Sequence, residues 1–299
     1  MKVTMGNVEL ELGGRYLTEL RSSNEILNDT EALRHRLQED GYLLIRDFHD
    51  REEVLTARRG MLRKLQAMGR LNPDAPFEEG RIGPDNKSAM FGGAPAPENE
   101  EELGPFYRLV NSGKVLDFFS RLLGGEAMTY DYKWPRAVAR GDFTGAHYDI
   151  VYMGRGTPNV YTMWTPLGDI PLELGPLAIC LGSQHFHKIR ETYGRMDVDR
   201  DQVEKGWFSE DPIEIVDRFG GRWATTAFHA GDAIIFGMFV MHASLDNTTN
   251  RYRLSADTRY QLRSEPVDER WIGQKPKGHY AWGKKPTVSI GEARAKWGV

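Results

Sequence analysis

The chain has 299 residues, of which 40% are hydrophobic and 27% charged, and its formal net charge is -4. This is the composition of a globular protein; its mild acidity and its lack of a long basic run argue against a nucleic-acid partner, and no apolar run approaches the roughly 18 residues of a membrane span. The single cysteine excludes an intrachain disulfide, and the absence of an apolar leader predicts a cytoplasmic protein without membrane attachment.

We expect one domain over residues 1–299, whose amino-terminal part supports a β core. Capping pairs at 28–31 (Asn, Glu) and 50–53 (Asp, Glu) predict the starts of two helices, and a short strand at 42–45 separates them. These helices are expected to pack on the outside of a sheet, so we assign residues 28–124 a supporting role. The sequence carries no signal for an oligomeric state.

Residues 72–103 are rich in proline, glycine and acids, which predicts a long loop. Such a loop is either an active-site lid or a plain surface excursion, and Met90 and Phe91 beside two glycines would suit a lid. A short amphipathic helix over 115–122 is then predicted to end at Gly124.

From residue 127 onward, strands follow one another with turn signals between them and no βαβ alternation. This favours a mainly β fold with flanking α-helices, a double-stranded β-helix (jelly roll, cupin-like) with its core at about 125–262 and a tail at 263–299. The expected strands are 127–132, 145–153, 160–166, 177–181, 223–228, 233–241 and 252–262.

A metal site is indicated by His147 and Asp149, because alternation along a strand would place both on one face, about 6.6 Å apart. The third ligand is expected at His242, where the almost wholly apolar strand 232–242 ends in a histidine. Two histidines and one carboxylate form the facial triad of non-haem Fe(II) oxygenases, although this spacing alone leaves zinc possible.

Iron is favoured by Arg253, eleven positions after His242, and by Ser244. A metal-bound 2-oxoacid needs a fixed cation for its distal carboxylate, and a guanidinium supplies two charge-assisted hydrogen bonds. The alternative is that this strand face is a solvated, ion-paired edge. Its members would be Arg251, Arg253, Ser255, Asp257 and Arg259.

The order of these motifs resembles the phytanoyl-CoA dioxygenase family of Fe(II)/2-oxoglutarate oxygenases. The resemblance runs from about Asp40 to Gln261. The matching motifs are His147-x-Asp149, Trp164, Gly175-Pro176-Leu177, Gly182-Ser183-Gln184-His185, Gly231-Asp232, His242-x-Ser244 and Arg253.

The resemblance implies the same jelly-roll fold, with Fe(II) on His147, Asp149 and His242. It also implies that 2-oxoglutarate is held by Arg253, Ser244 and Trp164 and, by a looser alignment, Thr129. Because halogenating members replace the ligand carboxylate, the retained Asp149 implies oxidation such as hydroxylation of a small-molecule substrate by O2, with release of succinate and CO2. The alternative is a cupin-like metal protein that binds or hydrolyses a ligand without oxidising it.

Other polar residues are expected to lie outside this chemistry. Lys133 and Arg136 precede the metal motif and are interpreted as surface cations, although an anionic substrate would suit them. Residues 185–222 form an insert that we expect over the active site. Of the remaining histidines, His185 and His187 are not expected to be ligands, His229 is expected in a turn, and His35, His49 and His279 are expected in solvent.

Overall fold

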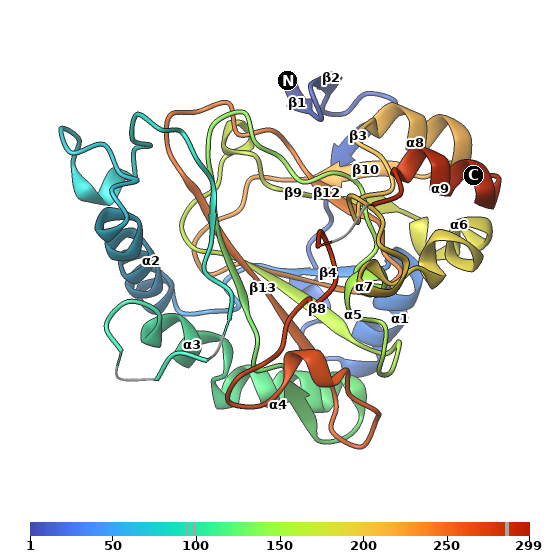
Figure 1. The fold of residues 1–299 in the computed structure, drawn as a ribbon. Helices are drawn as coiled ribbons and strands as arrows, with labels where there is room; N and C mark the ends of the chain where they lie inside the picture. The colour runs from blue at the N-terminus through green and yellow to red at the C-terminus, as the bar shows by residue number, and fades with distance from the viewer. Residues whose placement is uncertain (94, 98–99, 285–286) are drawn as a thin grey trace.

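Two β-sheets that face each other form the centre of the protein, and helices cover them from outside (Figure 1). The computed structural model describes residues 1–93, 95–97, 100–284 and 287–299. The larger sheet contains β4 (Tyr42–Ile45), β5 (Ala89–Met90), β6 (Ala127–Thr129), β7 (Trp134–Val138), β8 (Tyr161–Pro166), β11 (Ala233–Gly237) and β13 (Arg253–Leu262). The smaller sheet contains β3 (Leu17–Glu19), β9 (Leu177–Leu181), β10 (Arg222–Thr225) and β12 (His242–Ser244).

The order of the larger sheet is β4-β11-β8-β13-β7-β5, with β6 pairing the far end of β13, and that of the smaller sheet is β12-β9-β10-β3. Apart from the parallel pair of β10 and β3, the pairs within both sheets are antiparallel. The two facing sheets confirm the predicted mainly β class and jelly roll. A separate hairpin of β1 (Lys2–Met5) and β2 (Val8–Glu11) lies at one end of the body.

Apolar side chains hold the two sheets together. Leu44, Ile234 and Trp164 lie opposite one another on three neighbouring strands, so they point to the same face of the larger sheet. They belong to one buried cluster with Ile179 and Ala224 of the smaller sheet. The space between the sheets is therefore closed at this level, and any site must lie beside this cluster.

The outer face of the larger sheet is covered by the amino-terminal helices. On this face Phe119 stacks on Tyr260 of β13, with ring centroids 4.0 Å apart, and burial of one such ring contributes about 2 kcal/mol. This packing agrees with the supporting role expected for the helices. Their bounds are α1 (Thr30–Asp40), α2 (Arg51–Ala67), α3 (Gly104–Val110) and α4 (Gly113–Leu123).

The predicted helix starts are correct within one residue. The side chain of Asp50 accepts hydrogen bonds from the backbone N–H groups of Glu52 and Glu53, as the capping pair predicted. In α1 the cap is Asp29 rather than Asn28, and the helix ends at Gly41, whose φ of +82° suits glycine.

Two predicted strands are wrong around the metal motif. Residues 145–153 form no regular strand: Ala146 and His147 make isolated bridges, and helix α5 (Ile150–Met153) follows at once. The apolar stretch 233–241 is also divided, because β11 ends at Gly237 and the chain turns before entering the smaller sheet. Strand β7 and helix α3 were not predicted, and Pro135 inside β7 conceals the strand pattern.

Helices of the insert and the last helix of the tail, α9, lie together on the side away from α2 and α3 (Figure 1). The predicted capping box at Ser289 and Glu292 is confirmed at the start of α9. No helix in the described part of the chain is long and apolar enough to cross a membrane. The helices here are α6 (His187–Glu191), α7 (Val198–Asp201), α8 (Pro212–Phe219) and α9 (Ile290–Trp297). The 3-10 turns of the chain are Asn24–Ile26, Phe77–Glu79, Leu172–Leu174, Ser183–His185, Tyr193–Arg195 and Glu269–Trp271.

Candidate active site

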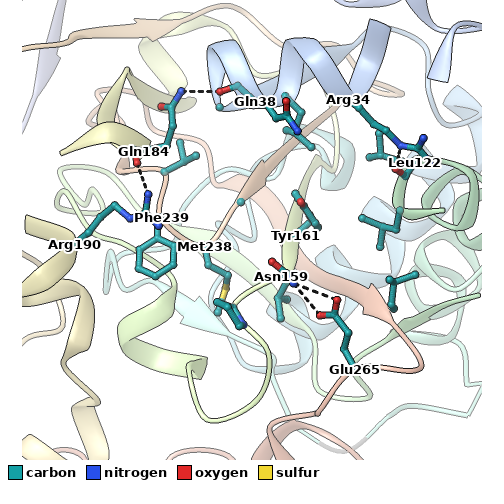
Figure 2. A pocket seen from close by; sticks show the side chains of 18 residues that line it. Arg34, Gln38, Leu122, Asn159, Tyr161, Gln184, Arg190, Met238, Phe239 and Glu265 are labelled. Atoms are coloured by element: carbon teal, nitrogen blue, oxygen red, sulfur yellow. Dashed lines mark hydrogen bonds between the residues drawn. The ribbon is translucent and has the colours of Figure 1, made fainter. Parts of the chain in front are cut away.

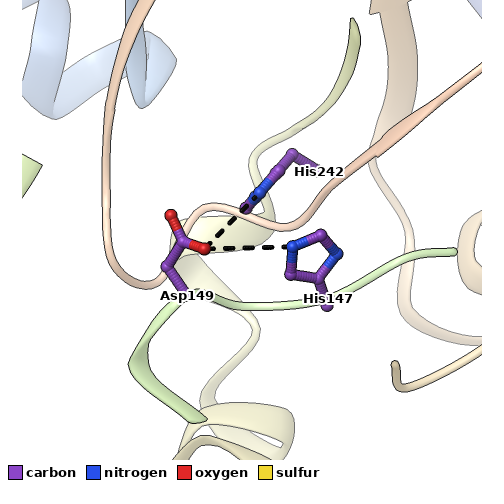
Figure 3. A group of neighbouring side chains, drawn as sticks. All are labelled: His147, Asp149 and His242. Carbon is purple, nitrogen blue, oxygen red and sulfur yellow. Dashed lines mark ion pairs between the residues drawn. The ribbon is translucent and has the colours of Figure 1, made fainter. Parts of the chain in front are cut away.

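Three buried side chains meet at the end of the smaller sheet, His147, Asp149 and His242 (Figure 3). One ligand atom of each lies within 4.8 Å of the others. The Oδ1 atom of Asp149 lies 3.9 Å from Nε2 of His147 and 3.8 Å from Nε2 of His242. The three residues predicted as metal ligands are thus brought together.

The backbone places these ligands by two different devices. His147 and His242 form an isolated antiparallel bridge, which sets their imidazoles side by side. The alternation argument placed Asp149 and His147 on one face of a strand, and this is wrong. The backbone of Asp149 is already helical, with φ -66° and ψ -26°, so the turn into α5 carries its carboxylate back toward the two rings.

The tautomers of both imidazoles follow from their backbone contacts. Nδ1 of His147 lies 2.8 Å from the carbonyl oxygen of Gly145, and Nδ1 of His242 lies 3.0 Å from that of Val240. A carbonyl oxygen can only accept, so each Nδ1 carries the proton and each Nε2 lone pair is left for a metal. Burial lowers the pKa of His147 to about 3 and also lowers the pKa of His242, so both rings are neutral at pH 7.

Asp149 is held as a carboxylate by two neighbours, Thr162, which the sequence analysis did not identify, and Arg259, which it named only as part of a possible solvated edge. Burial alone would raise the pKa of Asp149, but Arg259, the two histidines and a hydrogen bond from Thr162 bring the pKa below its usual range. The hydroxyl of Thr162 donates to Oδ2, and Nη2 of Arg259 lies 3.1 Å from the carboxylate. Oδ1, which accepts the hydrogen bond from Arg259, is also the oxygen that faces the imidazoles.

A small cavity of about 20 Å³ adjoins this centre and contains the expected cosubstrate residues. Arg253 is only 2% exposed; its Nη1 donates to the carbonyl of Gly175, and its Nε has no partner among the described residues. Burial, reinforced by nearby Arg136, lowers the pKa of Arg253 to about 10. Among the described residues no carboxylate is hydrogen-bonded to this guanidinium, although buried arginines normally have such a partner.

Ser244 and Trp164 also line this cavity, as predicted. The Oγ atom of Ser244 accepts a hydrogen bond of 2.9 Å from the backbone N–H of Thr144, so its own hydrogen is free to donate. Thr129 is not among the lining residues. It lies in β6 opposite Tyr260, and its hydroxyl is 2.5 Å from Nζ of Lys133.

A model of the phytanoyl-CoA dioxygenase (PhyH) family matches residues 37–255 of this sequence. The chain belongs to the phytanoyl-CoA dioxygenase family. Membership confirms the predicted family and identifies the protein as a non-haem iron, 2-oxoglutarate-dependent dioxygenase. The donor set of two neutral imidazoles and one carboxylate agrees with it.

Relatives of this dioxygenase include two hydroxylases from Streptomyces. The 1-deoxypentalenic acid 11-beta-hydroxylase of Streptomyces exfoliatus is 26% identical over 267 residues, which are 83% of this chain and 87% of that enzyme. The L-proline trans-4-hydroxylase of Streptomyces griseoviridis is 28% identical over 158 residues, 49% of this chain and 59% of that enzyme.

Solved structures share the fold of this dioxygenase. The apo form of EctD from S. alaskensis superposes with a TM-score of 0.56 at 18% identity, covering 86% of each chain. The epimerase SnoN in complex with Fe3+, alpha ketoglutarate and nogalamycin RO gives 0.55 at 19% identity, covering 83% of this chain and 87% of that one. These similarities confirm the jelly roll.

The inward face of β13 is not the solvated edge considered as an alternative for the dioxygenase. Arg253, Ser255, Asp257 and Arg259 are all buried there, and only Arg251, before the strand begins, is exposed. Alternation with period two could place these residues on one face, but it could not say which way that face pointed. Three of them, Arg253, Asp257 and Arg259, line the cavity.

The interpretation of Lys133 and Arg136 as surface cations is wrong. Lys133 is fully buried, with its Nζ bonded to the carbonyl of Tyr130. Arg136 lines the cavity, and its Nε donates to Asp257 at 2.8 Å. The position of Arg136 follows from β7, the strand that the sequence did not reveal, because its pairing with Ser255 of β13 turns Arg136 toward the interior. Lys133 directly precedes this strand.

Two histidines expected in solvent are also placed differently. His49 is 5% exposed, and burial lowers its pKa to about 3. His279 packs between Trp271 and Trp282 and contacts Asp199 of the insert. His185 and His187 are exposed and lie outside the metal centre, as predicted.

The insert reaches the metal motif. Phe208 donates its backbone N–H to Ala146, and a side chain on Gly145 would collide with the ring of Trp207. In the candidate lid at 72–103, Gly92 packs against the ring of Tyr132, while residues 94 and 98–99 lie outside the described part of the chain.

A larger cavity of about 580 Å³ lies elsewhere, beside α1 (Figure 2). Two of the polar groups along it are paired with neighbouring residues: Arg190 with the carbonyl of Gln184, and Asn159 with Glu265. None of the predicted site residues lines it. We therefore place the active site at the smaller cavity, where the ligand donors are.

Proposed function

We propose that this dioxygenase hydroxylates a small organic molecule, with Fe(II) on His147, Asp149 and His242 and 2-oxoglutarate anchored by Arg253 and Ser244. The observation that carries the proposal is the pairing of two features in one cavity. One is the set of three ligand atoms within 4.8 Å, and the other is a buried Arg253 whose Nε has no hydrogen-bond partner among the described residues.

The donor set fits iron. Two Nε2 lone pairs and one carboxylate oxygen would hold iron from one side, and its remaining positions would be available to a 2-oxoacid and oxygen. When bound, Fe(II) with 2-oxoglutarate and O2 supplies an oxidant for a substrate C–H bond, with release of succinate and CO2. A hydrolytic or merely binding cupin needs no buried cation beside its metal.

The chain's own residues orient these groups and keep water away. Two donors are available to the distal carboxylate of 2-oxoglutarate. One is Nε of Arg253, which has no partner in the described residues, and the other is the free hydroxyl hydrogen of Ser244. Trp164, which is 2% exposed, closes the wall of the cavity. The carbonyls of Gly145 and Val240 fix the ring orientations, and Thr162 fixes the carboxylate.

The class of substrate is inferred from the relatives. Two relatives are named for the hydroxylation of 1-deoxypentalenic acid and of L-proline, which are both small molecules. We infer a small-molecule substrate here and propose that residues 1–299 act as one domain, because insert and tail pack on the jelly roll. Thr129 as a cosubstrate contact and the cytoplasmic location stay predictions.

An anaerobic titration of the purified protein with Fe(II) and 2-oxoglutarate tests the proposal. We expect the weak visible charge-transfer band of the chelate to appear in the native protein and to be lost in Arg253→Gln at the same 2-oxoglutarate concentration. Arg251→Gln is the matched control, because this arginine is two positions upstream and exposed. Absence of the band, with tight Zn(II) binding instead, would refute the proposal.

A further inference from the structure

Three guanidinium groups enter the cavity beside the metal ligands, those of Arg136, Arg253 and Arg259. Two carboxylates, those of Asp149 and Asp257, also line it. Arginine does not lose its proton in proteins, so a buried excess of positive charge can be relieved only by an anion. The charge balance of this cavity therefore constrains what binds there.

The balance leaves one positive charge once the cofactors are counted. Three arginines and two carboxylates give +3 - 2 = +1 for the side chains, and the two histidines add no charge because each keeps one proton on Nδ1, toward a carbonyl oxygen, and leaves its Nε2 lone pair for the metal. Fe(II) adds two positive charges and 2-oxoglutarate adds two negative charges, so the sum stays at +1. This step rests on the proposed function.

The unmatched charge lies at Arg259. Arg136 is paired with Asp257, and Arg253 is accounted for by the distal carboxylate of 2-oxoglutarate. Arg259 shares Asp149 with the metal, and that carboxylate cannot neutralise both. Among the described residues Asp257 forms no hydrogen bond with Arg259; its carboxylate accepts from Nε of Arg136.

Arg259 is also incompletely bonded. It is 2% exposed, with Nη2 on Asp149, Nε 3.2 Å from the sulfur of Met153, and its guanidinium 4.7 Å from the ring centroid of Trp134. Its Nη1 is buried and has no hydrogen-bond partner among the described residues. A buried N–H of a charged group without an acceptor is rare in folded proteins.

Beside Arg259 stands an apolar wall. The ring of Trp134 packs against Tyr132 at 4.7 Å and against Trp271 at 5.0 Å between centroids. Trp271 belongs to the tail, so the tail contributes to this wall. A cation beside aromatic rings suits a ligand with one charged end and an apolar body.

We propose that the substrate carries one carboxylate, that Nη1 of Arg259 binds it, and that its apolar body packs along Trp134. Arg259 is thus the residue that selects acids over their neutral analogues. The carboxylate sits next to the metal ligand Asp149, so the oxidised carbon lies close to the acid group.

Pairs of acids and amides test this without turnover. The anaerobic Fe(II)–2-oxoglutarate complex is titrated with cyclohexanecarboxylate, benzoate, acetate and L-proline, each beside its amide, while the visible band is followed. We expect at least one acid to shift the band, with half-saturation at least about tenfold below that of its amide. Chloride at the same ionic strength should have no effect, which separates a built acid site from general anion screening.

Each outcome decides the proposal. If no acid shifts the band, or if the amides act equally well, the proposal is wrong while the proposed function stands. If acids only erase the band and added 2-oxoglutarate restores it, they compete at Arg253, and the proposal is again wrong. If the band never forms, the proposed function itself has failed.

Variants then assign the residue. Arg259→Gln should remove the preference for acids, and Arg251→Gln should keep it. Because Arg259 contacts Asp149, Arg259→Lys is included as a variant that keeps the charge but shortens the reach. We expect it to retain the band and to bind the acid at least about tenfold more weakly. An unchanged acid preference in either variant would contradict the assignment to Arg259.

Discussion

The main chains of His147 and His242 bond each other twice: the N–H of each donates to the carbonyl of the other, at 3.0 and 3.1 Å. This bridge joins the metal motif to the smaller sheet and sets the two imidazole centroids 4.1 Å apart. Ligand geometry is therefore fixed by backbone bonding and does not depend on the metal to draw the rings together. Preorganisation of this kind lowers the cost of binding.

Removal of one of these imidazoles should greatly weaken metal binding. We expect His242→Ala to weaken Fe(II) affinity by more than about 100-fold, beyond the loss expected for an outer-shell partner. Anaerobic calorimetry with Fe(II) measures this. His185→Ala, which removes an exposed histidine, should bind Fe(II) as the native protein does. Equal affinity of the two variants would contradict the ligand assignment.

Thr162 should affect the metal through Asp149 alone. Its hydroxyl donates to Oδ2, so Thr162→Val removes the bond that orients the carboxylate while keeping the shape of the side chain. We expect Fe(II) affinity to fall by about 10- to 100-fold, the usual range for loss of an outer-shell bond. Thr56→Val on the exposed face of α2 is the control. A native-like Fe(II) affinity in Thr162→Val would show that the bond from Thr162 does not orient the carboxylate of Asp149.

Ser244 should contribute to 2-oxoglutarate binding but not to iron binding. Ser244→Ala loses the donor to the distal carboxylate and leaves the N–H of Thr144 without its acceptor. A hydrogen bond of this kind contributes about 1 kcal/mol, so the dissociation constant of 2-oxoglutarate should rise about fivefold. The charge-transfer band gives this constant. An equally large change in Fe(II) affinity would contradict the assignment of Ser244 to the 2-oxoglutarate site.

Asp199 of the insert should determine whether the tail stays docked. Its Oδ1 accepts from three successive backbone N–H groups, those of residues 280–282, while Oδ2 accepts from Arg270 at 2.6 Å. Asp199→Asn leaves a buried arginine without one of its counter-charges, so the free energy of unfolding should fall by about 3 kcal/mol.

Urea unfolding and limited proteolysis of the tail measure the effect of Asp199→Asn. Asp217→Asn is the control, because it affects only exposed contacts, an ion pair with Arg15 and a hydrogen bond from Tyr16, and should change the free energy of unfolding by less than about 1 kcal/mol. The docking role of Asp199 would be excluded if both variants behaved alike.

Glu214 of α8, which is bonded to Arg294 of α9, should make the free energy of unfolding depend on pH. A hydrogen bond from Arg294 lowers the pKa of Glu214 from 4.5 to about 2. The folded state therefore holds this carboxylate ionised where the unfolded chain would protonate it. The stabilisation is complete above pH 4.5 and is lost as pH falls toward 2.

Substitution of Glu214 by glutamine should remove that part of the pH dependence. We expect thermal unfolding midpoints measured between pH 4.5 and pH 2 to fall less steeply in Glu214→Gln than in the native protein. Glu78→Gln, at the exposed pair with Arg59, should keep the native slope. Parallel curves for all three proteins would remove Glu214 from the acid response.

Local patterns in the sequence were sufficient where a short segment decides its own structure. The strands at 42–45 and 177–181 and the capped starts of α1, α2 and α9 depend on neighbours a few residues away, and their predictions were correct within a residue. The same holds for the three ligand types, because few side chains can bind iron. Their order along the chain was enough to propose the centre.

Tertiary structure alone decided which polar residues face the metal. Asp149 reaches the centre through a helical turn, and Arg136 reaches the cavity because a proline-containing strand pairs with β13. Thr162 and Arg259, which hold the ligand carboxylate, come from neighbouring strands far apart in the sequence. Period-two alternation states which residues share a face, but only long-range pairing states whether that face meets solvent or the metal.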